Sequence, residues 1–328
     1  MANPKIEPRK LEVVAQLCGY VDDLVDTKML KPDTCWQPSD FLPDFSNESY
    51  IEELKELRER ASNIPNTVII SLVGNMITEE ALPSYQTWFN LLEGMNPDRN
   101  VASDHAWARW SRAWTAEENR HGDLLNKYLF LTGRVDMKAV EQTIHRLIHN
   151  GVDNLTEADP YNGIIYTSFQ ERATKISHVN TGKLADKAGD SVLSKICKII
   201  AGDEARHENA YKGMMQKIFE LDPSGAMESF GKMMRTNIVM PARLMGEQQK
   251  LNLFDTFSAI TQNIGIYTAH DYASIIKHLV DYWSVEHLSG LSAEANKVQD
   301  YLCGLPDRFK KLAERVKQMS SEPELIWI

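Results

Sequence analysis

The chain has 328 residues, and its 36 Lys and Arg against 46 Asp and Glu give a formal net charge of −10. With 43% hydrophobic and 25% charged residues, its composition is that of a folded globular protein and excludes a disordered or collagen-like chain. The acidic balance argues against a nucleic-acid-binding protein, whose affinity depends on neutralising phosphates with basic side chains.

Other features narrow the class of protein. The four cysteines form no CxxC motif, so neither a disulfide scaffold nor a thiolate zinc site is expected. The first ten residues, MANPKIEPRK, contain no apolar stretch of the kind found in a secretory signal. The longest apolar runs are far shorter than the roughly 18–20 residues of a membrane-spanning helix. We therefore expect a soluble protein without membrane insertion.

The apolar residues recur with helical periodicity along most of the chain, and no alternating pattern of useful strand length occurs. After an N-terminal arm at 1–46, helices are predicted, in chain order, at 49–62, 68–93, 107–132, 136–150, 161–178, 188–219, 226–237, 255–265, 269–283 and 293–319. Pro83 clashes with the carbonyl group of Glu79, which predicts a kink in the second of these helices. The sequence thus predicts an all-α fold in one domain, residues 1–328. The segment 320–328 is expected to be a loose tail, with docking of Trp327 as the alternative.

Two five-residue segments carry the same chemistry. Glu117-Glu118-Asn119-Arg120-His121 and Asp203-Glu204-Ala205-Arg206-His207 each contain Glu-x-x-His. Positions three apart lie on one face of a helix, so each segment can offer a carboxylate and an imidazole to one metal ion. Two such helices, each with a partner helix that donates one Glu, form the dinuclear site of ferritin-like bundles. Carboxylate oxygens with imidazole suit Fe or Mn.

Candidate partner carboxylates precede each motif. Glu79 and Glu80 lie in an apolar stretch before the first motif, and Glu171 lies before the second. Burying an unpaired carboxylate costs several kcal/mol, and metal coordination removes that cost. Spacing alone leaves open whether Glu79 or Glu80, and Glu117 or Glu118, would be the ligand.

The residues around these motifs resemble the soluble acyl-acyl-carrier-protein desaturases, over nearly the whole chain. The resemblance is carried by the segments 35–38, 40–43, 76–83, 112–123, 166–174 and 203–208. It implies a ferritin-like four-helix bundle, extended by additional helices into one large domain, that binds two Fe(2+) ions per subunit. Carried over residue by residue, the iron ligands fall on Glu79, Glu118, His121, Glu171, Glu204 and His207.

The resemblance also implies an activity. Such enzymes use O₂ and two electrons, supplied by ferredoxin in plants, to introduce a cis double bond, here at the Δ9 position, into saturated chains on acyl carrier protein. It further implies a homodimer, located in the cytoplasm of a bacterium or the plastid stroma of a plant or alga. The acidic carrier requires a local basic patch, and the candidates are Lys175, Lys183, Lys187, Lys232, Arg235 and Arg243.

The resemblance suggests further roles around the irons. Asp203 and Trp36 match groups that surround one ligand histidine, and Thr174 either hydrogen-bonds bound oxygen or bonds its own helix backbone. The residues expected near the acyl chain, which plain core packing explains equally well, are Trp88, Leu91, Leu92, Gly163 and Ile164. Trp88 and Leu91 are bulkier than expected for an 18-carbon substrate, which favours a shorter chain.

Two other ferritin-like classes compete with this interpretation. The small subunit of ribonucleotide reductase has a Tyr one turn after the first ligand histidine, where this chain has Leu125. Ferroxidases and iron-storage proteins are about half as long and need no apolar pocket.

Overall fold

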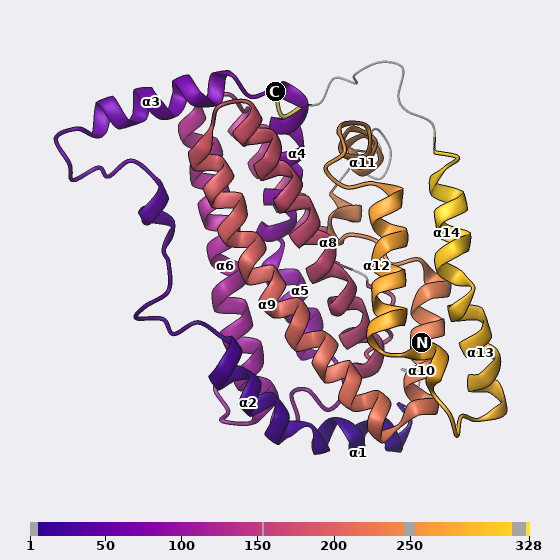
Figure 1. The fold of residues 1–328 in the computed structure, drawn as a ribbon. Coiled ribbons are helices and arrows are strands. Elements are labelled where there is room, and N and C mark those ends of the chain that lie inside the picture. Colours follow the sequence, from indigo (N-terminus) through magenta and orange to yellow (C-terminus); the bar gives the residue numbers. More distant parts are fainter. Residues whose placement is uncertain (1–5, 153, 246–252, 317–325) are drawn as a thin grey trace.

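The computed structural model describes residues 6–152, 154–245, 253–316 and 326–328 of the chain. Within these ranges the structure is helical and contains no strands, as predicted (Figure 1). None of the helices in the described part combines the length and the apolar character needed to cross a bilayer.

Four long helices form the central bundle: α4 (Asn66–Glu80), α6 (Ala106–Thr132), α8 (Pro160–Lys187) and α9 (Ser191–Leu221). They lie side by side, with α8 against α9, and α4 against both α6 and α8 (Figure 1). Nearly every residue of α4 is buried, which fits a helix that is covered on all sides by other elements. The bundle therefore provides the buried space that the predicted metal ligands require.

Local sequence signals set the ends of these helices. The Asp159 side chain accepts hydrogen bonds from the first turn of α8, which opens with Pro160. The Asp190 carboxylate accepts from Leu193 N and begins α9. Because Gly182 leaves room for Cys197, α8 continues to Lys187 and passes closely along α9. The helix predicted at 161–178 is thus longer at its C-terminal end.

Pro83 separates two helices. The prediction of one kinked helix at 68–93 was wrong, because α4 ends at Glu80 and α5 (Leu82–Asn90) begins after Ala81. Proline has no N–H for the Glu79 carbonyl group, and that oxygen instead accepts a hydrogen bond from the Tyr85 hydroxyl over 3.2 Å.

The predicted N-terminal arm at 1–46 is largely helical in its described part. It contains α1 (Pro8–Gln16) and α2 (Cys18–Lys28), which pack against the end of the bundle, before an extended stretch with the short 3₁₀-helix η1 (Pro38–Phe41). α3 (Tyr50–Ser62) follows. No helices were predicted within this arm, because α1 and α2 are short and only partly apolar.

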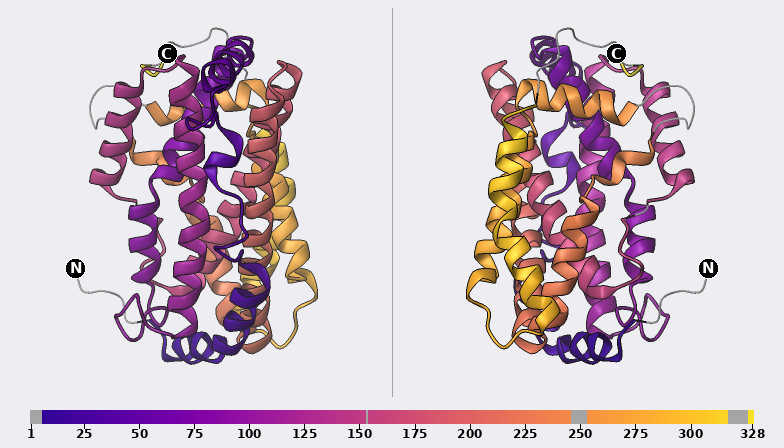
Figure 2. Two further views of the ribbon diagram at one scale, coloured as in Figure 1. Left: turned by 90° about the vertical axis from the view of Figure 1, so that its left-hand side faces the viewer. Right: turned by 90° about the vertical axis from the view of Figure 1, so that its right-hand side faces the viewer.

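The C-terminal third covers the outer side of α8 and α9 (Figure 2). This third contains α10 (Pro223–Thr236), η2 (Pro241–Leu244), α11 (Leu253–Ile264), α12 (Ala269–Tyr282), η3 (Val285–His287), α13 (Ala293–Cys303) and α14 (Leu305–Ala313). The remaining helix, α7 (Met137–Asn150), lies between α6 and α8 in the chain. The single helix predicted at 293–319 is divided at Gly304, because Pro306 cannot continue the α13 hydrogen-bond pattern.

The end of the chain returns to the bundle. Residues 320–325 of the predicted tail lie outside the described residues, but Trp327 is fully buried. Its indole Nε1 donates to Thr143 Oγ1 over 3.1 Å, and its carbonyl oxygen accepts from Asp136 N over 2.9 Å. Trp327 therefore anchors α7, in agreement with the alternative that it docks.

We expect Trp327→Ala to lower the free energy of unfolding by about 3–5 kcal/mol, the usual cost of removing a buried tryptophan side chain. Urea unfolding followed by circular dichroism measures it. Ile328→Ala is the matched control, since Ile328 is 45% exposed and should change stability by less than about 0.5 kcal/mol. Equal effects of the two variants would contradict the docking of Trp327.

Candidate metal centre

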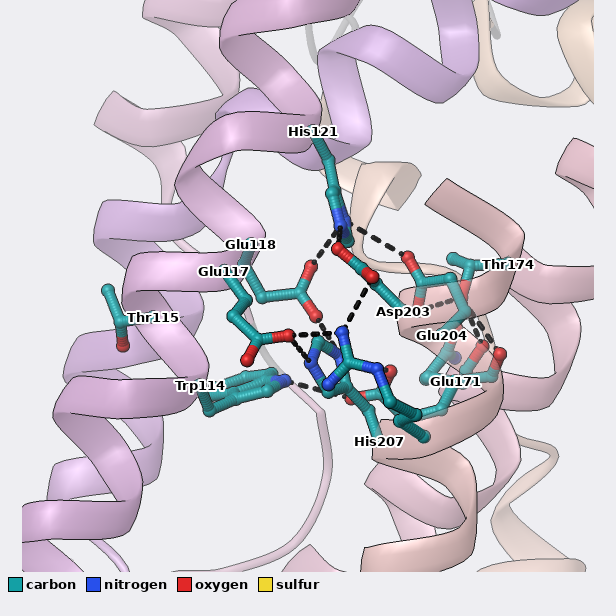
Figure 3. A network of polar contacts seen from close by, with 12 residues as sticks. Trp114, Thr115, Glu117, Glu118, His121, Glu171, Thr174, Asp203, Glu204 and His207 are labelled. Carbon is teal, nitrogen blue, oxygen red and sulfur yellow. Dashed lines mark hydrogen bonds and ion pairs between the residues drawn. The ribbon is translucent and has the colours of Figure 1, made fainter. Parts of the chain in front are cut away.

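Six buried side chains from the four bundle helices converge on one space. Figure 3 shows all of them except Glu79 with labels: Glu118, His121, Glu171, Glu204 and His207. Their ligand atoms form two overlapping groups, and within each group the atoms lie within 4.8 Å of one another. The first group is Glu79, Glu118, His121 and Glu204, and the second is Glu118, Glu171, Glu204 and His207. The structure thus brings together all six residues that the sequence predicts as ligands.

Distances show how the two groups share carboxylates. His121 Nδ1 lies 3.3 Å from an oxygen of Glu118 and 3.3 Å from an oxygen of Glu204. His207 Nδ1 lies 2.8 Å from the other oxygen of Glu118 and 3.5 Å from Glu171 Oε2. Glu118 and Glu204 therefore lie between the imidazoles, while Glu79 and Glu171 lie at the two ends.

The orphaned atoms of this cluster fit a pair of metal ions. Nδ1 of both histidines and one oxygen each of Glu118, Glu171 and Glu204 are buried, and none has a hydrogen-bond partner among the described residues. Buried polar atoms without partners are rare in folded proteins and call for an explanation. A divalent cation on each side would satisfy them, and this donor set of four carboxylates and two imidazoles suits iron or manganese.

Each motif orients the histidine of the other. His121 Nε2 lies 3.3 Å from Asp203 Oδ2, and His207 Nε2 lies 3.1 Å from Glu117 Oε2. In both motifs the acid directly before the candidate ligand glutamate thus contacts the opposite imidazole and turns its Nδ1 inward. Asp203 was predicted in this position, whereas Glu117 was considered only as a rival to Glu118. The shared acid-Glu-x-Arg-His pattern is the signal that would have identified it.

The arginines of the two motifs neutralise these acids. Arg206 Nη2 lies 2.7 Å from Glu117 and 2.6 Å from Asp203, and Arg120 Nη2 lies 3.4 Å from Asp203. Burial raises the pKa of Asp203, but its hydrogen bond with His121 and the neighbouring charges lower it to about 2. Asp203 therefore remains an acceptor for the histidine at any physiological pH.

Trp36 lies where the resemblance predicted it. Its Nε1 donates to Asp203 Oδ2 over 3.0 Å, and its ring stacks on His121 with centroids 6.1 Å apart. The Arg120 guanidinium covers the Trp36 ring at 4.4 Å. The extended stretch after α2 is held to the metal centre by this contact.

Two further contacts to the ligands were missed in the sequence. Trp114 Nε1 donates to Glu171 Oε1 over 3.1 Å, and His178 Nε2 lies 3.0 Å from Glu79 Oε1. Trp114 precedes Glu118 by one helical turn, so its position on the inner face of α6 was a usable signal. His178 on α8 contacts Glu79 on α4, which is far away in the sequence, so no local pattern indicates this contact.

Thr174 shows the backbone bonding that was one of its two predicted roles, and it also contacts a candidate ligand. Its Oγ1 lies 3.0 Å from the Gln170 carbonyl oxygen and 3.1 Å from that of Glu171, as expected for a threonine within a helix. The same hydroxyl lies 3.1 Å from Glu204 Oε2 and lines the cavity beside the cluster.

The pKa values of the metal-free cluster show how charge is balanced. Burial raises the pKa of Glu79 to about 7. Burial, followed by the charge of Glu118, raises the pKa of Glu171 well above its ordinary value. Burial lowers the pKa values of His121 and His207, but contacts with the carboxylates raise both well above their ordinary value. Protons on these glutamates and histidines thus balance the negative charge that bound cations would otherwise balance.

A cavity with a free volume of about 60 Å³ opens directly onto the carboxylates. Its wall combines four of the candidate ligands with aromatic and polar side chains: Glu79, Tyr85, Trp88, Trp114, Glu118, Tyr166, Thr167, Gln170, Glu171, Thr174, Glu204 and Pro241. The Trp88 indole packs on Tyr166 with centroids 5.4 Å apart, and its Nε1 donates to Thr156 Oγ1 over 2.8 Å.

The other predicted pocket residues lie elsewhere. Leu91 is 67% exposed, because α5 ends one residue earlier and turns it toward solvent, so its predicted place in the pocket was wrong. Leu92 and Ile164 are buried in the core, and Leu92 packs against Gly163, where a Cβ atom would lie 2.4 Å from its methyl group. None of these three residues lines the cavity.

The candidate basic residues are dispersed. Lys175 pairs with the buried Glu208, and Lys232 pairs with Glu157. Arg235 packs over the Tyr301 ring. The remaining candidates are Lys183, Lys187 and Arg243; the first two lie on the last turns of α8, and the third lies on η2.

Comparison with known proteins identifies relatives of the whole chain. Residues 9–328 match the family model described as fatty acid desaturase. The chain is 53% identical to stearoyl-[acyl-carrier-protein] 9-desaturase, chloroplastic, of Simmondsia chinensis, over 98% of this chain and 81% of that protein. It is 54% identical to stearoyl-[acyl-carrier-protein] 9-desaturase 1, chloroplastic, of Arabidopsis thaliana, over 96% and 80%.

A solved structure shows the same fold at lower identity. The X-ray structure of DesA2 from Mycobacterium tuberculosis H37Rv superposes with a TM-score of 0.57 at 17% identity, covering 84% of this chain and 96% of that chain.

We expect the melting temperature of the metal-free protein to fall as the pH rises. Burial raises the pKa of Glu79 from 4.5 to about 7, and the pKa of Glu171 is also raised. Contacts with carboxylates raise the pKa values of His121 and His207. The stability that each group contributes is therefore complete below its unfolded pKa and is lost as the pH rises through its folded pKa. Calorimetry between about pH 5 and 9 measures the slope.

The metal-loaded protein should show a flat or rising profile, because metal binding displaces those protons. Glu79→Gln combined with Glu171→Gln should flatten the profile of the metal-free protein, since glutamine does not titrate. Parallel slopes for metal-free and metal-loaded protein would contradict the assignment.

Proposed function

The chain belongs to the fatty acid desaturase family, and we propose that it introduces a cis double bond, at the Δ9 position, into saturated acyl chains carried on acyl carrier protein. One observation supports this best: the cavity beside the cluster is walled by four of the candidate ligands and by four aromatic side chains. A saturated chain in that cavity would lie directly against the metal centre. The names of the curated relatives point to the same reaction.

We propose two Fe(2+) ions per subunit. Glu79 with His121 would hold one ion and Glu171 with His207 the other, while Glu118 and Glu204 are shared between them. These residues would hold the ions, and the ions would supply O₂ activation: with two electrons and two protons, O₂ would be reduced to two waters as two vicinal hydrogens leave the acyl chain.

The remaining chemistry consists of positioning and water exclusion by the chain itself. Trp114 and His178 hold the terminal carboxylates Glu171 and Glu79, and the Thr174 hydroxyl holds Glu204. These bonds leave the carboxylates with few orientations, which lowers the reorganisation needed during the reaction. The aromatic wall excludes bulk water from the reacting carbons.

The size of the cavity bears on the substrate. Its free volume of about 60 Å³ is far below the roughly 300–1,000 Å³ of typical ligand sites. Side chains must therefore move when an acyl chain enters. The two largest side chains in the wall are Trp88 and Trp114, and Trp114 is already bonded to Glu171. We propose that Trp88 limits the chain length and favours acyl chains shorter than 18 carbons.

The partners proposed from the resemblance are acyl carrier protein, ferredoxin as electron donor and a second copy of the chain. Lys183, Lys187 and Arg243 are our candidates for contacts with the acidic carrier, because Lys175 and Lys232 already pair with carboxylates. The ribonucleotide-reductase alternative gains no support, because Leu125, one turn after His121, is fully buried and carries no phenol.

We expect iron-loaded protein, incubated aerobically with stearoyl-acyl-carrier-protein, ferredoxin and a reductant, to remove about 2 mass units from the acyl chain, because two hydrogens leave per turnover. Mass spectrometry measures the loss, and fragmentation gives the double-bond position.

Glu204→Ala should abolish that loss, since it removes a shared ligand. Glu80→Gln is the matched control and should keep the activity, because Glu80 bonds Asn126 outside the cluster. If no carrier-bound chain of any length loses mass while O₂ is still consumed, the substrate assignment is wrong and an unspecified oxidase remains.

Trp88→Met should shift the preference toward longer chains. We expect the ratio of kcat/KM for 18-carbon over 16-carbon acyl-acyl-carrier-protein to rise about tenfold, because two further methylenes each gain about 0.8 kcal/mol on burial. Leu91→Ala is the control at a position that was predicted for the pocket but is exposed, and it should leave the ratio unchanged. An unaltered ratio in Trp88→Met would contradict the role of Trp88.

A further inference from the structure

The residues that directly follow two candidate ligands are bonded to one another. Arg172 follows Glu171 on α8, Glu208 follows His207 on α9, and Arg172 Nη1 donates to Glu208 Oε1 over 2.7 Å. Successive residues of a helix point about 100° apart around its axis. This ion pair therefore joins α8 and α9 at the level of the ligands, but on a different face from the one that enters the metal centre.

Glu208 is held more tightly than a surface ion pair. Its side chain is 1% exposed, and three more basic groups besides Arg172 contact it: Lys175, Lys212 at 2.7 Å and His278 at 3.3 Å. A buried carboxylate is stable only when its charge is paired and hydrogen-bonded. Glu208 meets this requirement, because four basic side chains contact its carboxylate.

The cluster also includes the helix outside the bundle. His278 belongs to α12, and its Nε2 lies 2.7 Å from Lys212 Nζ. Lys212 is buried, its Nζ lies 4.5 Å from the centre of the Tyr282 ring, and its carbonyl oxygen accepts from Trp283 Nε1 over 3.1 Å. Glu208 on α9 thus contacts side chains of both α8 and α12, and it joins the three helices at the level of the candidate ligands.

The other half of the metal centre is built differently. Gly122 follows His121 as Glu208 follows His207, and a Cβ atom there would lie 3.3 Å from the α4 backbone at Glu79. Direct backbone approach therefore sets the spacing of α4 and α6. α8 and α9 also approach closely at Gly182, but beside Glu171 and His207 they are joined by the Arg172–Glu208 ion pair.

We propose that Glu208 is a positioning residue of the metal centre, and that its bond to Arg172 fixes the spacing at which Glu171 and His207 bind one divalent cation. This inference rests on the proposed metal ligands. Loss of the bond would leave both ligands present but poorly aligned, and changes in groups that orient ligands commonly weaken metal affinity about 10–100-fold.

The test measures Co(II) binding by absorption, using Co(II) alone as the probe. In a His121→Ala background only the half with Glu171 and His207 keeps its imidazole, and there we expect Glu208→Gln to weaken affinity about tenfold or more. In a His207→Ala background the same change should have little effect. The contrast between the backgrounds separates positioning from a general loss of structure, which would weaken both halves.

A second variant tests whether the loss of affinity comes from the missing bond or from misfolding of the Glu208 variant. Arg172→Gln removes the bond between the helices, while Glu208 keeps Lys175, Lys212 and His278 as partners. It should show the same selective loss with an unchanged circular dichroism spectrum. Glu208→Asp should restore part of the affinity. Glu220→Gln, on the exposed side of α9 beside Lys217, is the matched control and should bind like the parent.

The outcomes test the metal ligands and the role of Glu208 separately. If the unaltered chain binds no Co(II), the proposed metal ligands are wrong. If the unaltered chain binds Co(II) and Glu208→Gln and Arg172→Gln bind it equally well in both backgrounds, the positioning role of Glu208 is wrong while the metal centre stands.

Discussion

Four carboxylates buried together in an apolar bundle are the constraint on which the structure depends. Glu79, Glu118, Glu171 and Glu204 are each at most 4% exposed, and their mutual repulsion with loss of hydration would cost many kcal/mol if all were charged and unpaired. Only protons or cations can balance them. The raised pKa values of the metal-free cluster and the orphaned ligand atoms are two signs of the same imbalance. The fold provides the rigid frame, and the bound cations would provide the missing charge.

The frame is built from two interlocked copies of one motif. Each acid-Glu-x-Arg-His segment supplies a shared ligand, a histidine, an acid that orients the opposite histidine and an arginine that neutralises the acids. α6 and α9 consequently cannot be shifted against one another by a turn without breaking both histidine contacts at once. The arrangement lets one short pattern, used twice, fix the ring orientation on both sides of the centre.

Helices and ligands were predictable because both depend on local spacing. The 3.6-residue period identified the bundle, and the two Glu-x-x-His motifs with preceding glutamates indicated a metal centre. The choice of Glu79 over Glu80 and of Glu118 over Glu117 came from the family resemblance. Contacts between distant helices, such as His178 with Glu79, leave no local pattern and were missed. Leu91 was misplaced because its exposure depends on where α5 ends, which spacing does not define. Pro306 could have indicated that the helix predicted at 293–319 divides into two. We predicted a single helix because the amphipathic pattern continues on both sides of the proline.

One proline couples the metal centre to the cavity. Because Pro83 ends α4 directly after Glu79 and Glu80, α5 leaves in a new direction and carries Tyr85 and Trp88 into the cavity wall. The Tyr85 hydroxyl donates a hydrogen bond to the Glu79 carbonyl oxygen, to which Pro83 has no N–H to donate. A continuous helix would rotate the wall residues away from the carboxylates and leave no space beside them. The position of a terminal candidate ligand and the shape of the pocket beside it therefore follow from the same break in the backbone.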